Sequence, residues 1–71
     1  MTHFKGKVVY QDLEGGFWGI VADDGTEYKP ENLASEFQKE GLKVEVKAEE
    51  SMGFGIFMWG TGINIKECKK I

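Results

Sequence analysis

The side chains that most often carry enzyme chemistry are scarce in this chain of 71 residues. It holds one histidine, His3, and one cysteine, Cys68, near opposite ends. A Cys–His pair acts as nucleophile and base only when both groups lie within hydrogen-bond reach and a third group orients the base. Terminal segments rarely provide such positioning. The sequence therefore predicts no catalytic residues and no enzyme activity.

Four acidic residues in two predicted turns offer oxygen atoms that a hard cation would accept. They are Asp12, Glu14, Asp23 and Asp24. Their spacing does not match an EF-hand loop, and a turn already explains the last two as solvated residues. One cysteine excludes an internal disulfide, and no Cys/His set is present for a structural zinc. We predict no metal site and no cofactor, and leave open whether the four carboxylates converge on a cation.

Two segments that interleave glycine with aromatic residues, 15–19 and 53–60, remain as candidates for binding. Aromatic rings fill a core or offer a flat surface for stacking, and glycine lets strands bend or approach a ligand closely. Successive side chains of a strand point to opposite faces, so one set of rings must face outward unless something covers it. The candidate binding residues are Phe17, Trp18, Phe54, Phe57 and Trp59.

The overall charge argues against a nucleic-acid-binding protein. The formal net charge is −3 and the sequence pI is about 5.0, whereas nucleic-acid binders usually carry a basic footprint. Lysines do gather near both ends of the chain, and they would form a small basic edge if the terminal strands were neighbours. Solubility and protection of a strand edge are the explanation of these lysines that we favour. They are Lys5, Lys7, Lys66, Lys69 and Lys70.

The location of the protein is predicted from its thiol and its hydropathy. The first residues are too polar for a signal peptide, and no apolar run approaches the roughly 20 residues of a membrane span. A lone thiol suits a reducing compartment. These features predict a cytoplasmic protein with no membrane partner.

Hydrophobic alternation predicts a mainly β protein. It places strands at 4–11, 17–22, 26–29 and 42–49, and a final strand over 54–67 that a bulge at Gly60–Gly62 bends. The Asp-Gly pair at 24–25 predicts a two-residue type I′ turn between the second and third strands.

One short helix is predicted between the third and fourth strands. Leu33 and Phe37 lie four residues apart on one face, Asn32 can cap the N-terminus, and Gly41 suits the C-terminus. Two helical turns are unstable alone, so Leu33 and Phe37 must press into a core.

This element order predicts the fold. Three strands, a short helix and two further strands are the order of a small five-stranded OB-fold-like Greek-key barrel, with the helix closing one end. We therefore predict a single OB-fold-like domain over residues 1–71. An SH3-like barrel, in which a short 3₁₀ turn replaces the helix, is the alternative.

The stretch from Glu14 to Tyr28, followed by Asn32-Leu33 and later by Met58-Trp59-Gly60, resembles a small group of prokaryotic proteins. Their shared pattern couples EGGFxGIxxDDGxxYxPxNL to a late MWG. The resemblance covers most of the chain and implies a compact OB-like domain. It implies no activity and no site residue, because no function is established for that group.

The function that these observations favour is binding. We predict a small module that contacts a protein or a small ligand through its aromatic, glycine-rich barrel face, as a monomer or a weak homodimer. A single-stranded nucleic-acid-binding OB-fold protein is the alternative, because OB-folds use their second and third strands for that purpose.

Overall fold

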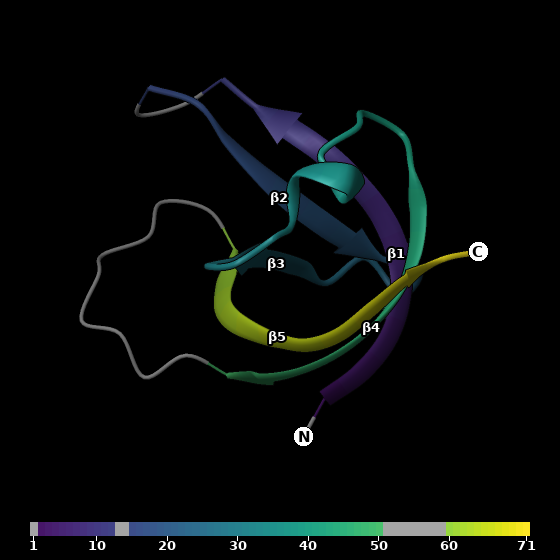
Figure 1. The fold of residues 1–71 in the computed structure, drawn as a ribbon. Coiled ribbons are helices and arrows are strands. Elements are labelled where there is room, and N and C mark those ends of the chain that lie inside the picture. The colour runs from purple at the N-terminus through teal and green to yellow at the C-terminus, as the bar shows by residue number, and fades with distance from the viewer. Residues whose placement is uncertain (1, 13–14, 51–59) are drawn as a thin grey trace.

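Five strands form a closed barrel in the computed structural model of the chain, which describes residues 2–12, 15–50 and 60–71 (Figure 1). The elements are β1 (Thr2–Gln11), β2 (Phe17–Ala22), β3 (Glu27–Pro30), the 3₁₀ turn η1 (Ser35–Phe37), β4 (Lys43–Glu50) and β5 (Thr61–Lys70). The strands are hydrogen-bonded in the order β1-β2-β3-β5-β4, and β1 also pairs with β4. Of the strand pairs described, β3–β5 runs parallel and the others are antiparallel. The predicted mainly β, five-stranded, OB-fold-like barrel is confirmed.

Strand β1 closes the barrel because it bends from one neighbour to the other. Residues 2–7 pair with β4, and residues 6–11 pair with β2, so Gly6 faces both Ala22 and Val44. A Cβ atom at Gly6 would lie 2.5 Å from the carbonyl oxygen of Val21. Only glycine fits at this crossing, since a methyl group would collide with backbone.

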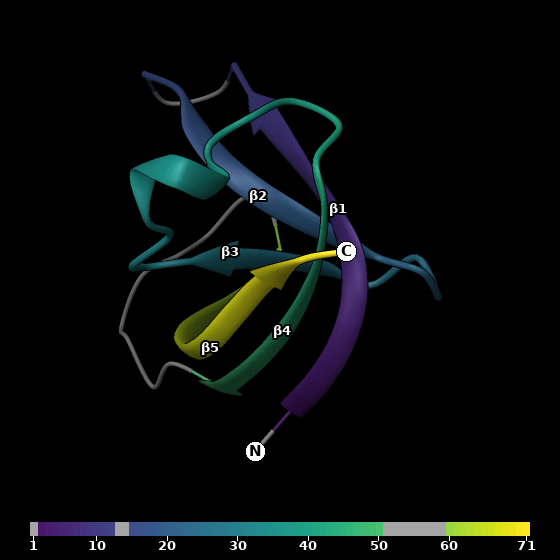
Figure 2. The same cartoon turned by 45° about the vertical axis from the view of Figure 1, so that its right-hand side comes forward.

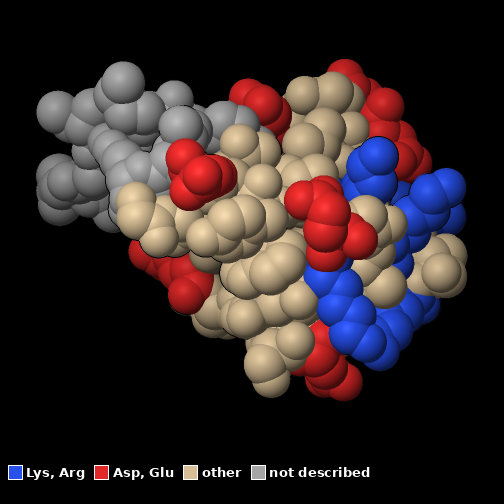
Figure 3. All heavy atoms as spheres, turned by 90° about the horizontal axis from the view of Figure 1, so that it is seen from above, with Lys and Arg blue, Asp and Glu red and all other residues tan. Residues whose placement is uncertain are grey.

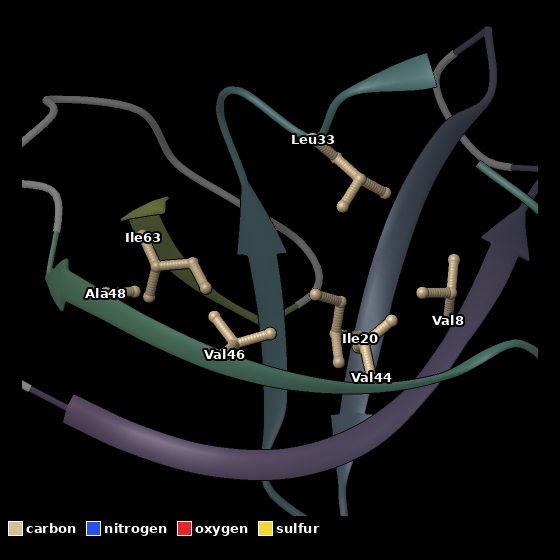
Figure 4. Packing of buried hydrophobic residues seen from close by; sticks show 7 residues of the cluster. All are labelled: Val8, Ile20, Leu33, Val44, Val46, Ala48 and Ile63. Carbon is tan, nitrogen blue, oxygen red and sulfur yellow. The ribbon is translucent and has the colours of Figure 1, made fainter. Parts of the chain in front are cut away.

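The core is built from the inward side of the strands and from the segment before η1 (Figure 4). Its fully or largely buried members are Val8, Ile20, Leu33, Val44, Val46, Ala48 and Ile63. The alternation in β4, with Val44, Val46 and Ala48 at 0% exposure, is the pattern predicted for a strand with one buried face. No helix in the described part of the chain has the length and apolarity to cross a membrane.

The predicted helix of two turns is wrong in length. Only the three residues of η1 are helical, Ala34 stands at its N-cap, and no side chain caps it. The predicted packing of this segment into the core is confirmed, because Leu33 is buried and Phe37 packs against the core. Gly41 has the predicted left-handed conformation, with φ +84°, but it lies beyond η1, where its N–H donates to the carbonyl of Val8.

Asn32, predicted as a helix cap, instead extends the β3–β5 ladder with its side chain. Its Oδ1 accepts a hydrogen bond of 2.8 Å from the backbone N–H of Ile65, and its Nδ2 donates to the Ile65 carbonyl at 3.0 Å. The same nitrogen lies 3.3 Å from Oδ1 of Asn64. The carboxamide thus satisfies both backbone groups of Ile65, as a neighbouring peptide would.

Asn32→Asp should lower the free energy of unfolding by about 1 kcal/mol, because the carboxylate cannot donate to the Ile65 carbonyl. Urea unfolding followed by circular dichroism measures the loss. Asn64→Ala removes only the longest of these contacts and serves as the control. Equal stability of the two variants would show that the Asn32 side chain does not hold β5.

The turn between β2 and β3 differs from the predicted type I′ turn. Ile20 pairs with Tyr28 and Val21 with Glu27, and the N–H of Ala22 donates to the carbonyl of Thr26. The loop therefore holds the three residues 23–25. It ends on Gly25 at φ +92°, whose N–H donates to the carbonyl of Ala22. One left-handed glycine is enough for a loop of this length, whereas a type I′ turn needs two such positions.

The bulge that the structure describes in the last strand lies at Lys66. The predicted bulge at Gly60–Gly62 joins this strand to segment 54–59, so the described residues do not test it. The β4–β5 register shifts by one residue between Lys47, which faces Glu67, and Ala48, which faces Ile65. Lys66 is the extra residue, and it resets the alternation so that Cys68 rather than Glu67 packs against the core. Ile63 and Ile65 both contact the core, as predicted. The predicted segment 54–59 of this strand lies outside the described residues.

Candidate functional site

Two of the predicted binding residues, Phe17 and Trp18, belong to the described part of the chain, and they lie on different faces of β2. Trp18 and Ile20 belong to or pack against the core cluster, which does not include Phe17 and Val21 among the residues that the structure describes. Since side chains alternate along a strand, Phe17 and Trp18 lie on opposite faces and cannot form one binding surface. Phe54, Phe57 and Trp59, the other predicted site residues, lie outside the described part of the chain.

The outward side of β2 continues onto β1 and β3. Val9 faces Gly19 across the β1–β2 ladder, Lys7 faces Val21, and Nζ of Lys29 lies 4.8 Å from the centre of the Phe17 ring. We call this surface the outer face and define it by Val9, Phe17, Val21 and Lys29, all of which are half-buried. An ammonium group over an aromatic ring is a favourable cation–π contact.

Sequence reasoning found Phe17 and missed the other members of the outer face. Val21 was known to share the side of Phe17, but Val9 and Lys29 come together with it only through the strand register. The signal that places them is the pairing of Lys7 with Val21, which sets Val9 opposite Gly19. Register depends on the loops between strands, and these were the least accurate part of the prediction.

Trp18 instead helps to close one end of the barrel. Its ring meets the Tyr10 ring edge-on, with centroids 5.1 Å apart and an interplanar angle of 67°. Tyr10 is 45% exposed, and its backbone N–H donates to a carboxylate oxygen of Glu40. Gly16, at φ +94°, lies so close that a Cβ atom there would overlap the Tyr10 hydroxyl. Trp18 is therefore a packing residue beside an exposed tyrosine.

His3 and Cys68 do not form a catalytic pair. His3 projects from the outer side of β1, where Nε2 lies 2.6 Å from a carboxylate oxygen of Glu45, whereas Cys68 packs against the core. Both line a surface hollow of about 330 Å³, but the described structure contains no hydrogen bond between them. Burial, with a smaller effect of Glu36, raises the pKa of the Cys68 thiol, which disfavours the nucleophilic thiolate. Both terminal strands are paired, so neither residue lies on a frayed end.

Of the four predicted acidic residues, Asp12, Asp23 and Asp24 do not come together in the described part of the chain, and Glu14 lies outside it. Asp12 follows β1 at one end of β2, and Asp23 and Asp24 follow β2 at its other end. An Oδ1 atom of Asp24 accepts a hydrogen bond from the N–H of Thr26, which lowers the pKa of that carboxyl. Residues 2–12, 15–50 and 60–71 contain no group of three metal-ligating side chains.

The hypothesis of a basic edge from neighbouring terminal strands is wrong, because β4 lies between β1 and β5. Glu45 of β4 accepts hydrogen bonds from His3 and from Lys69, and these lower the pKa of its carboxyl. In the view of Figure 3, lysine side chains gather on one side of the molecule, with acidic side chains beside them. Since Glu45, Glu49 and Glu67 form ion pairs with His3 and with lysines of β4 and β5, the terminal strands contribute to a face of mixed charge.

Comparison with known proteins does not show a family for this chain. The chain matches no protein-family model, and none of the curated proteins is similar to it in sequence. The resemblance drawn from the glycine-aromatic pattern stays a prediction. The function must therefore be argued from the surface itself.

Proposed function

We propose that this protein is a binding module that recognises a protein partner through its outer face. One observation carries the proposal: β2 is apolar on both sides, and within the described residues the core cluster includes Trp18 and Ile20 from one of these sides. Phe17 and Val21 are left on the outward side, with Val9 beside them. Apolar side chains gathered outside the core mark interaction sites more often than they occur by accident.

The chemistry of the outer face favours a protein segment over the alternatives. Two valines and one phenylalanine offer apolar contact. Lys29 and Lys7 add two positive charges next to them, and Glu27, opposite Val21 on β3, adds one negative charge. A segment with an apolar anchor and acidic neighbours is complementary to this arrangement. Small ligands prefer concave sites, and the two hollows described in this molecule have none of the four outer-face residues in their lining.

The runner-up is a single-stranded nucleic acid that stacks a base on Phe17. Its support is the position of Phe17 on β2, part of the usual OB-fold binding surface. The net charge of −3 weakens that support, since phosphate contacts carry much of the affinity of nucleic-acid binders. We also propose a cytoplasmic location, because Cys68 is a free thiol.

Selection of peptides from a random library on the immobilised protein tests the proposal. Enriched peptides should combine an aromatic or aliphatic anchor with acidic residues, and Val21→Lys should weaken their binding at least about tenfold, since it places a charge in the apolar contact. Lys69→Ala, on another face, should bind them like the wild type. Circular dichroism must first show that both variants fold.

Two outcomes would contradict the proposal. One is a set of peptides that bind Val21→Lys as tightly as the wild type. The other is that no peptide is enriched while an oligothymidine at low salt shifts the amide resonances of Val9, Phe17 and Val21. That result would establish the nucleic-acid alternative.

A further inference from the structure

A second surface hollow lies between the first residues of β1 and the β2–β3 loop. Figure 2 shows the backbone of this loop running beside β1. It has a volume of about 370 Å³ and is lined by His3, Phe4, Lys5, Ala22, Asp23 and Asp24. The backbone N–H of Asp23 donates to the carbonyl of Lys5 at 2.9 Å, which fixes the loop against the strand. This hollow is not part of the outer face, although it lies next to it. Lys5 is two residues before Lys7 on β1, and Asp23 is two residues after Val21, in the loop that follows β2.

The floor of the hollow is apolar and rigid. The Phe4 ring stacks on the Tyr28 ring with centroids 4.2 Å apart and planes 13° from parallel. Ala22 is almost fully buried beside it. Burial raises the pKa of the Tyr28 hydroxyl, with smaller effects of Asp24 and Glu50, so this ring adds no negative charge at neutral pH. A partner would meet a flat apolar base.

The rim carries charge of both signs, and the charges on it are not neutralised by each other. Lys5 and His3 stand on the β1 side, and Asp23 and Asp24 on the loop side. All four are exposed. In the described part of the chain no carboxylate lies within 4 Å of the Lys5 ammonium, and no cationic group lies within 4 Å of the Asp23 carboxylate. Two opposite charges on adjacent backbone positions are therefore left available to another molecule.

We infer that this hollow is a weak, salt-sensitive homodimer interface with two-fold symmetry. A patch with a basic half and an acidic half is complementary to itself, because a two-fold axis places the basic half of one copy on the acidic half of the other. Lys5 then pairs with Asp23 of the second copy, and the same pair forms again on the other side of the axis. The apolar floors around Phe4 meet at the centre.

A second copy fits this patch better than other occupants do. A polyanion would be repelled by Asp23 and Asp24, and a polycation by Lys5. A stable dimer buries roughly 1,200–2,000 Å² in total, or about 800 Å² on each copy, and the accessible surface of one copy is 4613 Å². The small hollow therefore predicts an association at the weak end of this range, held by charge as much as by apolar contact.

Reversing the charge of Lys5 or of Asp23 tests the homodimer, and sedimentation velocity measures how far the protein associates. The wild type should move from the 8.0 kDa monomer towards the dimer as concentration rises at low salt, and added salt should reverse this. Lys5→Glu alone and Asp23→Lys alone should each weaken the homodimer about tenfold, because the symmetry removes each pair twice. An equimolar mixture of the two variants should recover a dimer, since the new carboxylate of the first variant then faces the new ammonium of the second, and the native pair of Asp23 with Lys5 forms on the other side of the axis.

The controls are Lys39→Glu and Glu36→Lys, which make the same charge changes away from the hollow and should leave the dimer unchanged. Three results would overturn the inference: a wild type that stays monomeric at every concentration, single variants that dimerise like the wild type, or a mixture that does not associate. Peptide binding at the outer face is a separate readout, so failure here leaves the proposed function standing, and its failure leaves the dimer standing.

Discussion

Gly6→Ala should remove much of the stability of the barrel, by about 3 kcal/mol or more. The new Cβ atom would lie 2.5 Å from the carbonyl oxygen of Val21 and 2.9 Å from Cα of Ala22. These are backbone atoms of β2 and cannot turn aside as a flexible side chain would. Gly6 is also the residue at which β1 pairs with both neighbours, so any displacement opens the closure of the sheet. A domain of this size has a total stability of only about 4–10 kcal/mol.

Urea unfolding followed by tryptophan fluorescence and circular dichroism measures this loss. Gly41→Ala is the matched control, because Gly41 has φ +84° and nothing within 4 Å of its added Cβ atom. Its cost should be about 1 kcal/mol, from backbone conformation alone. If Gly6→Ala were no more destabilising than Gly41→Ala, β1 and β2 would not approach each other as described.

Ile20→Ala should lower the free energy of unfolding by about 3 kcal/mol, because Ile20 is fully buried in the middle of the core. Ile20 is flanked by Val8 on β1 and Tyr28 on β3, and the cavity left behind would lie at the centre of the cluster in Figure 4. Strands on both sides are paired to β2, so they cannot collapse to fill the space.

Val21→Ala is the control for Ile20→Ala, one residue along the same strand on the outer face. Since Val21 is only half-buried and makes no contact with the core cluster, its truncation should cost less than about 1 kcal/mol. Chemical unfolding of the two variants side by side compares the two faces of β2. Equal losses would mean that both faces serve as core, and this would remove the basis for a binding surface.

The strands were predictable from the sequence because their periodicity is a local property. The bounds of β2 and the inward side of β4 follow directly from the order of apolar and polar residues. The wrong parts depend on distant contacts. The sequence around Asn32 predicts a helix cap, but its carboxamide instead forms hydrogen bonds with the backbone of Ile65. The loop at 23–25 is fixed by the hydrogen bond from the N–H of Ala22 to the carbonyl of Thr26.

The candidate site was only partly predictable for the same reason. Alternation along β2 shows that Phe17 and Trp18 point in opposite directions, but not which side faces the core. The barrel decides this, because Ile20 meets Val8 and Val44 inside it and Trp18 follows to the same side. The position of Lys29 over the Phe17 ring likewise requires the β2–β3 register, which the sequence does not specify.

The most direct test of the outer face is the map of backbone amide shifts when a selected peptide is added to isotopically labelled protein. We predict that the largest changes fall on Val9, Phe17, Val21 and Lys29, with little change at Tyr10 and Trp18 on the other side of the sheet. Changes centred instead on Tyr10 and Trp18, or on the face of β4 and β5, would contradict the assignment of the outer face as the binding surface.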